Sequence, residues 1–250
     1  MARIQGKVAI VTGSARGIGA GIAARFGKEG AKVVCFDRNP ADETVAHIKA
    51  EGGEAIAIRC DISKLDSIEA AVQEVLKTYG TIDILVNSAG LSKMASITEA
   101  TEVDWDYVHN VTLKGTWMMI KSVAPTMIKN KYGKIINIAS ISGCVAFVNQ
   151  SIYCAAKGGV VNMTRELGVE LAKYGINVNA INPSVVDTPL FLDIKSPLEG
   201  KFLQECIEGH PIGRISTPED IAGPAVFLAS DDADFICGHI LAVDGGWTAQ

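Results

Sequence analysis

The alternation of short apolar runs with longer helical patterns most constrains the fold of this 250-residue chain. Seven runs are rich in β-branched residues, and most of them are nearly continuously apolar. Strands of a parallel sheet that is covered on both faces have this composition. The runs are residues 7–13, 31–37, 54–61, 82–90, 134–140, 176–184 and 239–246.

Helical patterns fill the intervals between these runs. Strand–helix alternation implies right-handed crossovers, and therefore a doubly wound α/β fold with seven parallel strands and helices on both faces. No linker or repeat interrupts the pattern, so we expect one domain over residues 1–250. The predicted helices are residues 17–29, about 40–51, 64–79, about 101–130, 152–173 and 217–230.

One long stretch, residues 185–216, follows neither pattern. Loops of this length in a compact domain are usually functional, such as lids or binding loops. We therefore expect a substrate-binding loop at about 188–212.

Composition excludes several classes of protein. A net charge of −5 argues against nucleic-acid and anionic-membrane partners, because a basic excess is needed to neutralise phosphates. No apolar stretch is long enough to span a bilayer, and the N-terminus lacks a secretory signal. The six cysteines form no C-x-x-C pair, and the four histidines lack metal-ligand spacing. We expect a reduced, metal-free, cytoplasmic protein.

The stretch TGSARGIG, residues 12–19, predicts a phosphate cradle. It follows the first predicted strand and opens the first predicted helix, where backbone N–H groups and the helix dipole favour an anion. Gly13 allows a sharp exit from the strand, and Gly17 and Gly19 remove Cβ atoms that would block phosphates. The alternative is a strand–helix turn with incidental glycines.

Polar residues end the next three predicted strands: Asp37, Asp61 and Asn87. Open α/β sheets bind ligands at this edge, and an acidic residue in the position of Asp37 accepts hydrogen bonds from ribose hydroxyls. Its carboxylate would repel a 2′-phosphate, so NAD is expected rather than NADP. Arg16 and Arg38 oppose this expectation, because either could bind that phosphate. Asp37 as a simple turn residue is the alternative.

The stretch YCAAK places Tyr153 and Lys157 on one face of a helix, and Ser140 ends the preceding strand. These groups suit hydride transfer between an alcohol and a nicotinamide, since the alcohol must also lose a proton. Tyr with a pKa of about 10 is a poor base at neutral pH, but a neighbouring cation typically lowers a pKa by about 1–3 units. We therefore expect Lys157, together with the positive ring of the oxidised cofactor, to lower the pKa of Tyr153, with Ser140 holding the substrate oxygen.

Taken together, these motifs resemble the classical short-chain dehydrogenase/reductase family, over essentially the whole chain. TGSARGIG is similar to its T-G-x-x-x-G-x-G loop, NSAG (87–90) to its N-N-A-G motif, and NPSVVDTP (182–189) to its N-P-G-x-[VI]-x-T segment. The resemblance implies a Rossmann-like fold and a catalytic set of Asn110, Ser140, Tyr153 and Lys157. The cofactor-binding residues that it implies, together with those reasoned above, are Gly13, Arg16, Gly17, Ile18, Gly19, Asp37, Asp61, Ile62, Asn87, Tyr153, Lys157, Val186 and Thr188.

Within this resemblance, Asp61 would bind adenine, Asn110 would link Lys157 through water to bulk solvent, and Val186 and Thr188 would bind the nicotinamide side. Asn110 as an ordinary helix position and Thr188 as a cap are the alternatives. Ser184 stands where the family usually has glycine. If that position has a positive φ, a serine there is strained.

The leading hypothesis is an NAD-dependent oxidoreductase that interconverts a secondary alcohol and a ketone. The alternatives are NADPH-dependent reduction of a carrier-bound 3-oxoacyl chain and a non-catalytic nucleotide-sensing scaffold. Ser142 and Gln150, with Asn149, favour a small hydroxyl-rich substrate such as a polyol, sugar or sugar acid, unless the amides face solvent. Apolar residues around much of 111–128 and 158–171, and the resemblance itself, predict a homotetramer.

Overall fold

Seven parallel strands form one sheet in the computed structural model, which describes residues 2–190 and 199–250. The strand order is β3-β2-β1-β4-β5-β6-β7, so the chain winds outward from β1 in one direction and then from β4 in the other. The predicted doubly wound sheet is confirmed. Its strands are β1 (Val8–Thr12), β2 (Lys32–Asp37), β3 (Glu54–Arg59), β4 (Ile84–Asn87), β5 (Gly133–Ile138), β6 (Ile176–Pro183) and β7 (Ile240–Val243).

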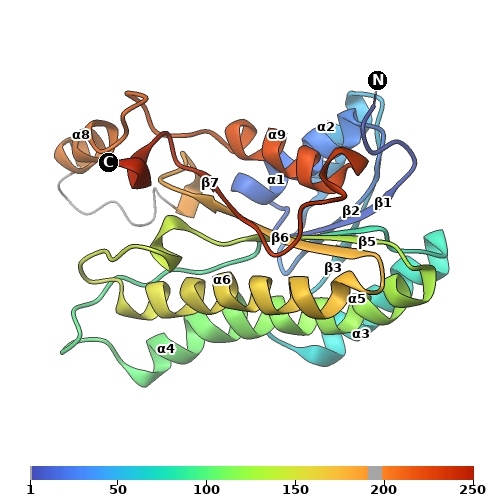
Figure 1. Cartoon of the computed structure of the whole chain (residues 1–250), viewed down its shortest axis with the longest axis horizontal. Coiled ribbons are helices and arrows are strands. Elements are labelled where there is room, and N and C mark those ends of the chain that lie inside the picture. The colour runs from blue at the N-terminus through green and yellow to red at the C-terminus, as the bar shows by residue number, and fades with distance from the viewer. Residues whose placement is uncertain (1, 191–198) are drawn as a thin grey trace.

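Helices cover both faces of this sheet (Figure 1). One layer holds α1 (Gly17–Lys28), α2 (Asp42–Ala50) and α9 (Pro218–Ala229). The opposite layer holds α3 (Leu65–Tyr79), α4 (Glu102–His109), α5 (Thr116–Asn130) and α6 (Ser151–Ala172). No helix among the described residues is both long enough and apolar enough to cross a membrane.

The two layers explain why the strands are continuously apolar. Along β2, Val33 and Cys35 belong to the core under α1 and α9, whereas Val34 and Phe36 belong to the core under α3 and α5. All four are fully buried, because successive side chains of a strand point to opposite faces and both faces are covered.

The predicted helix at about 101–130 is interrupted. Between α4 and α5, residues Asn110–Gly115 form a π-helical turn. Thr112 Oγ1 in this turn accepts a hydrogen bond from Leu91 N and donates one to Leu91 O. A Cβ at Gly115 would lie 2.8 Å from the Ile62 carbonyl oxygen, so the turn packs closely on a neighbouring loop. These long-range contacts leave no trace in a 3.6-residue periodicity, and such bulges often occur at functional sites.

The stretch 185–216 is not wholly irregular, because it contains the helix α8 (Glu199–Glu208). The less exposed side chains of α8 and the turn after it recur at helical spacing, a pattern that the sequence analysis missed. They are Phe202, Leu203, Cys206, Ile207 and His210. Residues 191–198 of the predicted substrate loop lie outside the described residues.

Candidate active site

The glycine loop runs from β1 to the first residue of α1, Gly17, as predicted. Gly13 has a φ of +67°, and a Cβ there would lie 2.7 Å from the Ala89 Cα atom. A Cβ at Gly19 would overlap the Gly13 carbonyl oxygen. Both glycines are therefore required by close backbone approach. The first residues of α1, Gly17 to Gly19, line a groove, so the N-terminus of this helix is accessible to an anion.

A groove opens at the carboxyl edge of the sheet beside this loop. Its other wall is formed by residues 88–91, which directly follow β4, together with Val111, Pro189 and Leu190. The predicted cofactor residues that line it are Gly13, Arg16, Gly17, Ile18, Gly19, Asp37, Asp61, Ile62 and Thr188. The structure thus brings together nine residues from four separate segments of the chain.

Asp37 lies in this groove with its carboxylate held in place. One oxygen accepts a hydrogen bond from Ala15 N at 3.1 Å, and the other accepts one from Asn39 N at 2.9 Å. The Arg16 and Arg38 residues line the same groove. The carboxylate and the two candidate phosphate-binding cations therefore share one region.

Asp61 lies at the groove with its carboxylate hydrogen-bonded by Ser63. Ser63 donates two hydrogen bonds to Asp61 Oδ1, from its hydroxyl at 2.6 Å and from its N–H at 3.0 Å. The hydroxyl bond is the main reason why the pKa of Asp61 lies below its usual value.

Asn87, by contrast, is only 3% exposed and does not line the groove. Its Nδ2 donates to Asn137 Oδ1 at 2.9 Å, and Asn137 Nδ2 donates in turn to Thr164 Oγ1. The Asn87 Oδ1 atom is buried without a hydrogen-bond partner among the described residues, and its predicted cofactor contact stays a prediction. The following residue, Ser88, lines the groove instead.

The predicted Ser140, Tyr153 and Lys157 cluster forms where β5 ends against α6. Lys157 Nζ donates a 2.7 Å hydrogen bond to Ile138 O, two residues before Ser140, and lies 5.7 Å from the centre of the Tyr153 ring. A Cβ at Gly90 would lie 3.5 Å from the same ammonium, and Gly90 lines the groove. The cluster is thus adjacent to the groove at Gly90, although its three residues are not among those that line the groove.

Without the coenzyme, Lys157 by itself does not bring the pKa of Tyr153 below its usual value. Burial raises the pKa of Tyr153 to about 12, although a hydrogen bond with Ser140 opposes this shift. Burial also lowers the pKa of Lys157 to about 8. Removal from water disfavours the charged form of both groups.

Ser140 is oriented by its neighbour. The Ser142 backbone N–H donates a hydrogen bond of 3.1 Å to Ser140 Oγ, so the hydroxyl oxygen is already an acceptor. Its own proton can then be donated to another oxygen.

Other predicted residues occupy distinct positions around the cluster. Asn110 begins the π-helical turn, and Val186 is buried beside Thr188. Ser142 is buried, Gln150 is the residue preceding α6, and Asn149 is exposed with a φ of +61°.

The anticipated strain at Ser184 is absent. Among the described non-glycine residues, only Lys131 and Asn149 have a positive φ. Serine therefore fits this backbone without the penalty expected from the family pattern.

Two threonines that support the groove were not assigned from the sequence. Thr12 Oγ1 accepts hydrogen bonds from Ser88 N and Ala89 N at 3.0 and 3.1 Å, which fixes the segment after β4. Thr112 holds Leu91 from the other side. Thr12 precedes the glycine loop directly, and this position was the available clue.

Comparison with known proteins agrees with this geometry. Residues 13–248 match the family model described as enoyl-(acyl carrier protein) reductase. Galactitol 2-dehydrogenase of Agrobacterium fabrum is 41% identical over 252 residues, with 98% of each chain covered. A 3-oxoacyl-(acyl-carrier-protein) reductase of Thermotoga maritima is 36% identical over 246 residues, also with 98% of each chain covered.

Among solved structures, a proposed NAD(P)-dependent gluconate 5-dehydrogenase of Beutenbergia cavernae contains NADP at low occupancy. It superposes with a TM-score of 0.94 at 36% identity, covering 99% of this chain and 98% of its own. The chain therefore belongs to the short-chain dehydrogenase/reductase family, and it is an NAD(P)-dependent oxidoreductase that acts on CH–OH groups.

Proposed function

We propose that this protein is an NAD-dependent dehydrogenase that interconverts a secondary alcohol and a ketone of a small, hydroxyl-rich compound. The observation that carries the reaction is the cluster of Ser140, Tyr153 and Lys157, which lies next to the groove where Gly90 separates Lys157 from it. A bound nicotinamide supplies the hydride acceptor or donor. The chain itself must bind the substrate oxygen and move a proton.

Each residue of the cluster has a distinct proposed role. Ser140 donates its hydroxyl proton to the substrate oxygen, since its own oxygen is occupied by the Ser142 N–H. Tyr153 transfers the proton to or from that oxygen as general acid or base. The Lys157 ammonium has donors beyond the one that bonds Ile138, and these would hold ribose hydroxyls and favour the Tyr153 phenolate. Asn110 would hold a water that links Lys157 to solvent.

Asp37 supports the choice of NAD. Its carboxylate accepts two backbone N–H groups and faces the groove, where it would bond ribose hydroxyls and repel a 2′-phosphate. Asp61 and Ile62 would hold the adenine, Gly13, Gly17, Ile18 and Gly19 the pyrophosphate, and Val186 and Thr188 the nicotinamide side. Asn87 stays a proposed cofactor-binding residue through its unpartnered Oδ1 atom. The similar structure with bound NADP supports the alternative, a preference for NADP. In that case Arg16 and Arg38 would bind the 2′-phosphate.

The substrate class rests on polar residues near the cluster. Ser142 and Gln150 flank Ser140 and Tyr153 in sequence, and buried polar groups without partners would oppose an apolar chain. The galactitol 2-dehydrogenase relative supports a polyol. The 3-oxoacyl reductase relative supports the alternative of an acyl substrate reduced with NADPH.

An oxidation screen tests this proposal. Polyols, sugar acids, hydroxy acids and simple secondary alcohols are each offered with NAD⁺ and with NADP⁺, and 3-oxoacyl thioesters are offered with NADH and NADPH. We expect the highest kcat/KM for a polyol or sugar acid with NAD⁺. Preference for a long unsubstituted alcohol, or for a 3-oxoacyl thioester with NADPH, would reject the substrate class.

The remaining expectations belong to the same proposal. We propose that the chain works as one domain whose residues 188–212 contribute the substrate-binding loop, and that it acts in the cytoplasm. We also propose a homotetramer, because large apolar side chains lie exposed on the outer helices.

A further inference from the structure

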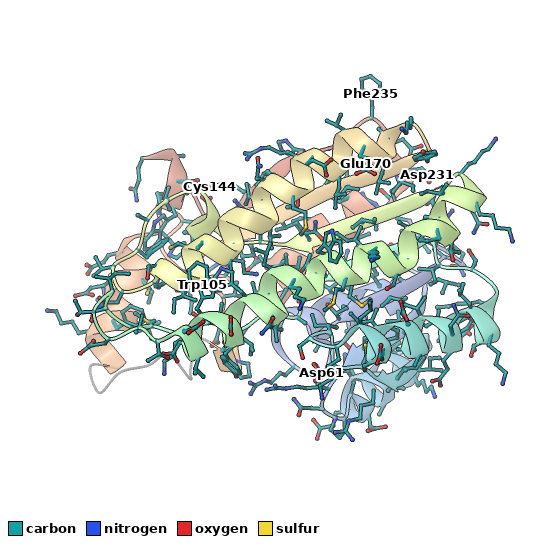
Figure 2. All side chains as sticks on the ribbon, turned by 90° about the horizontal axis from the view of Figure 1, so that it is seen from below. Asp61, Trp105, Cys144, Glu170, Asp231 and Phe235 are labelled. Atoms are coloured by element: carbon teal, nitrogen blue, oxygen red, sulfur yellow. The ribbon has the colours of Figure 1, made fainter. Side chains whose placement is uncertain are left out.

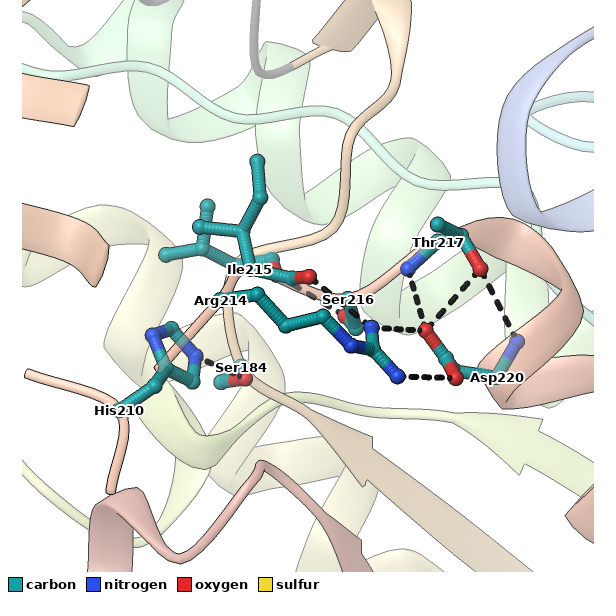
Figure 3. Close-up of polar contacts among 8 residues, drawn as sticks. Ser184, His210, Arg214, Ile215, Ser216, Thr217 and Asp220 are labelled. Atoms are coloured by element: carbon teal, nitrogen blue, oxygen red, sulfur yellow. Dashed lines mark hydrogen bonds and ion pairs between the residues drawn. The ribbon is translucent and has the colours of Figure 1, made fainter. Parts of the chain in front are cut away.

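Ser184 and His210 form a hydrogen bond that links two parts of the site. Ser184 directly follows β6 and opens the loop that carries Val186 and Thr188. His210 follows α8 and is only 3% exposed. Its Nε2 atom lies 2.6 Å from Ser184 Oγ, although the two residues are 26 positions apart (Figure 3).

The partners of the imidazole determine the direction of this bond. His210 Nδ1 lies 2.5 Å from the Cys206 carbonyl oxygen, which can only accept. Nδ1 therefore carries the proton, and in the neutral ring Nε2 is an acceptor. Ser184 must donate its hydroxyl proton to Nε2. A glycine at position 184 would leave this buried nitrogen without its partner.

The same loop is fixed at a second point. Ser216 donates two hydrogen bonds to Val185 O, from its N–H at 3.0 Å and its hydroxyl at 2.9 Å, and its carbonyl accepts Asp187 N at 2.8 Å. Thr217, the next residue, is the N-cap of α9 and forms a capping box with Asp220 (Figure 3). Asp220 also forms an ion pair with Arg214, which precedes Ser216 in the chain (Figure 3). The loop is thus attached to α9 through Ser216 and to α8 through Ser184.

Aromatic contacts extend the α8 attachment toward the catalytic cluster. The His210 ring meets the Trp247 ring edge-on at 4.8 Å, and Trp247 contacts Phe147 at 6.0 Å between ring centres. Phe147 lies on the segment between Ser140 and Tyr153. A Cβ at Gly209 would overlap the Trp247 ring, so this contact requires glycine beside His210.

From these contacts we propose that Ser184 and His210 are positioning residues that hold α8 in register with the nicotinamide-side loop. Neither needs to touch the reacting atoms. Their bond joins the loop with Val186 and Thr188, the end of α8 and, through Trp247, the segment that carries Phe147. Loss of the bond would misplace α8 relative to the cluster, and so would weaken substrate binding more than the chemical step. This role rests on the proposed function.

A double-mutant cycle tests the link. Ser184→Ala removes the hydroxyl, and His210→Phe removes both ring nitrogens but keeps a ring against Trp247. Ser184→Ala should raise the substrate KM about tenfold, the ratio expected for one buried hydrogen bond, and His210→Phe, which also loses the bond to Cys206 O, at least as much; kcat should change less than about threefold in either. The double variant should be no worse than His210→Phe alone, because that variant has already lost the bond to Ser184. Ser184→Thr, which keeps a hydroxyl, should restore the KM.

A second measurement requires neither substrate nor coenzyme. Amide hydrogen exchange of α8 should be faster in Ser184→Ala than in wild type, while exchange in α9 stays unchanged. Thr78→Ala, which removes a remote exposed hydroxyl bonded to Glu74 O, is the matched control. If the screen finds no substrate, hydrogen exchange still tests whether the bond between Ser184 and His210 holds α8 in place.

Wild-type α8 exchange in Ser184→Ala would overturn the proposal. So would additive effects in the cycle, or a fall in kcat and thermal stability with KM unchanged.

Discussion

Lys157 Nζ lies 5.7 Å from the centre of the Tyr153 ring and donates its 2.7 Å hydrogen bond to the Ile138 carbonyl. The phenol and the ammonium are thus neighbours, yet burial favours the neutral form of both groups. It raises the pKa of Tyr153 to about 12 and lowers the pKa of Lys157 to about 8. The protein without coenzyme therefore holds a phenol that is a weak acid. A positively charged nicotinamide ring beside it would favour the phenolate that alcohol oxidation requires.

Tyr153→Phe should lower kcat at least about 10²-fold, because general acid–base groups typically contribute 10²–10⁴-fold. NADH affinity should change less than about threefold, since the ring remains and only the hydroxyl is lost. Steady-state kinetics and NADH fluorescence titration measure the two effects. Tyr174→Phe makes the same chemical change at a partly exposed position and serves as the control. A Tyr153→Phe enzyme with more than about a tenth of wild-type kcat would contradict the assigned role.

Lys157→Met should change how stability depends on pH. Folding lowers the pKa of Lys157 from 10.5 to about 8, so between these values the unfolded chain binds more protons than the folded protein. Stability contributed by this group therefore rises with pH across that window. The Tm of wild type relative to Lys157→Met should increase from about pH 7 to about pH 10, in thermal melts followed by circular dichroism.

Lys129→Met, at an exposed position of α5, is the control for this pH effect. Its Tm should follow wild type throughout. A Tm difference between wild type and Lys157→Met that stays constant with pH would show that burial does not lower the pKa of Lys157.

Asp37→Asn should weaken or reverse the preference for NAD over NADP. The substitution removes the charge that would repel a 2′-phosphate but keeps the side-chain shape and one of its acceptors. The measurement is the ratio of kcat/KM values for the two coenzymes. Asp42→Asn removes the same charge at an exposed position in the first turn of α2 and should leave the ratio unchanged. Equal use of both coenzymes by the wild-type enzyme would refute the proposed role of Asp37.

The exposed faces of the outer helices predict self-association. Trp105 on α4 is 45% exposed and Val169 on α6 is 82% exposed. Phe235 is also exposed, and its side chain projects from the edge of the molecule (Figure 2). These exposed apolar side chains on outer elements are the reason to expect an interface there. Light scattering at micromolar concentration should give a tetramer of the 26.4-kDa chain, and Val169→Asp should shift it to smaller species. A monomer of wild type at that concentration would contradict the prediction.

Local patterns were sufficient for much of the fold. Burial on both faces makes a strand such as β2 continuously apolar, and the glycines at 13 and 19 must be glycine because backbone lies against them. The pairing of Tyr153 with Lys157 was equally predictable, since residues four apart share one face of a helix.

Several features depended on contacts between distant segments, which sequence spacing cannot reveal. Asn87 turned inward because Asn137 lies opposite it on the neighbouring strand. The π-helical turn at Asn110 accompanies the bonding of Thr112 to Leu91. Ser184 was expected to be strained, whereas the fold placed it within hydrogen-bond distance of His210.

The sequence by itself therefore determined the order of strands and helices, the turn that needs glycine and the residue types at the cluster, because each depends on neighbours within about one turn of helix or one strand. Only the tertiary structure decided the pKa values of Tyr153 and Lys157 and the partner of Ser184. The physical reason is that desolvation and long-range hydrogen bonds depend on which segments surround a group after the chain has folded.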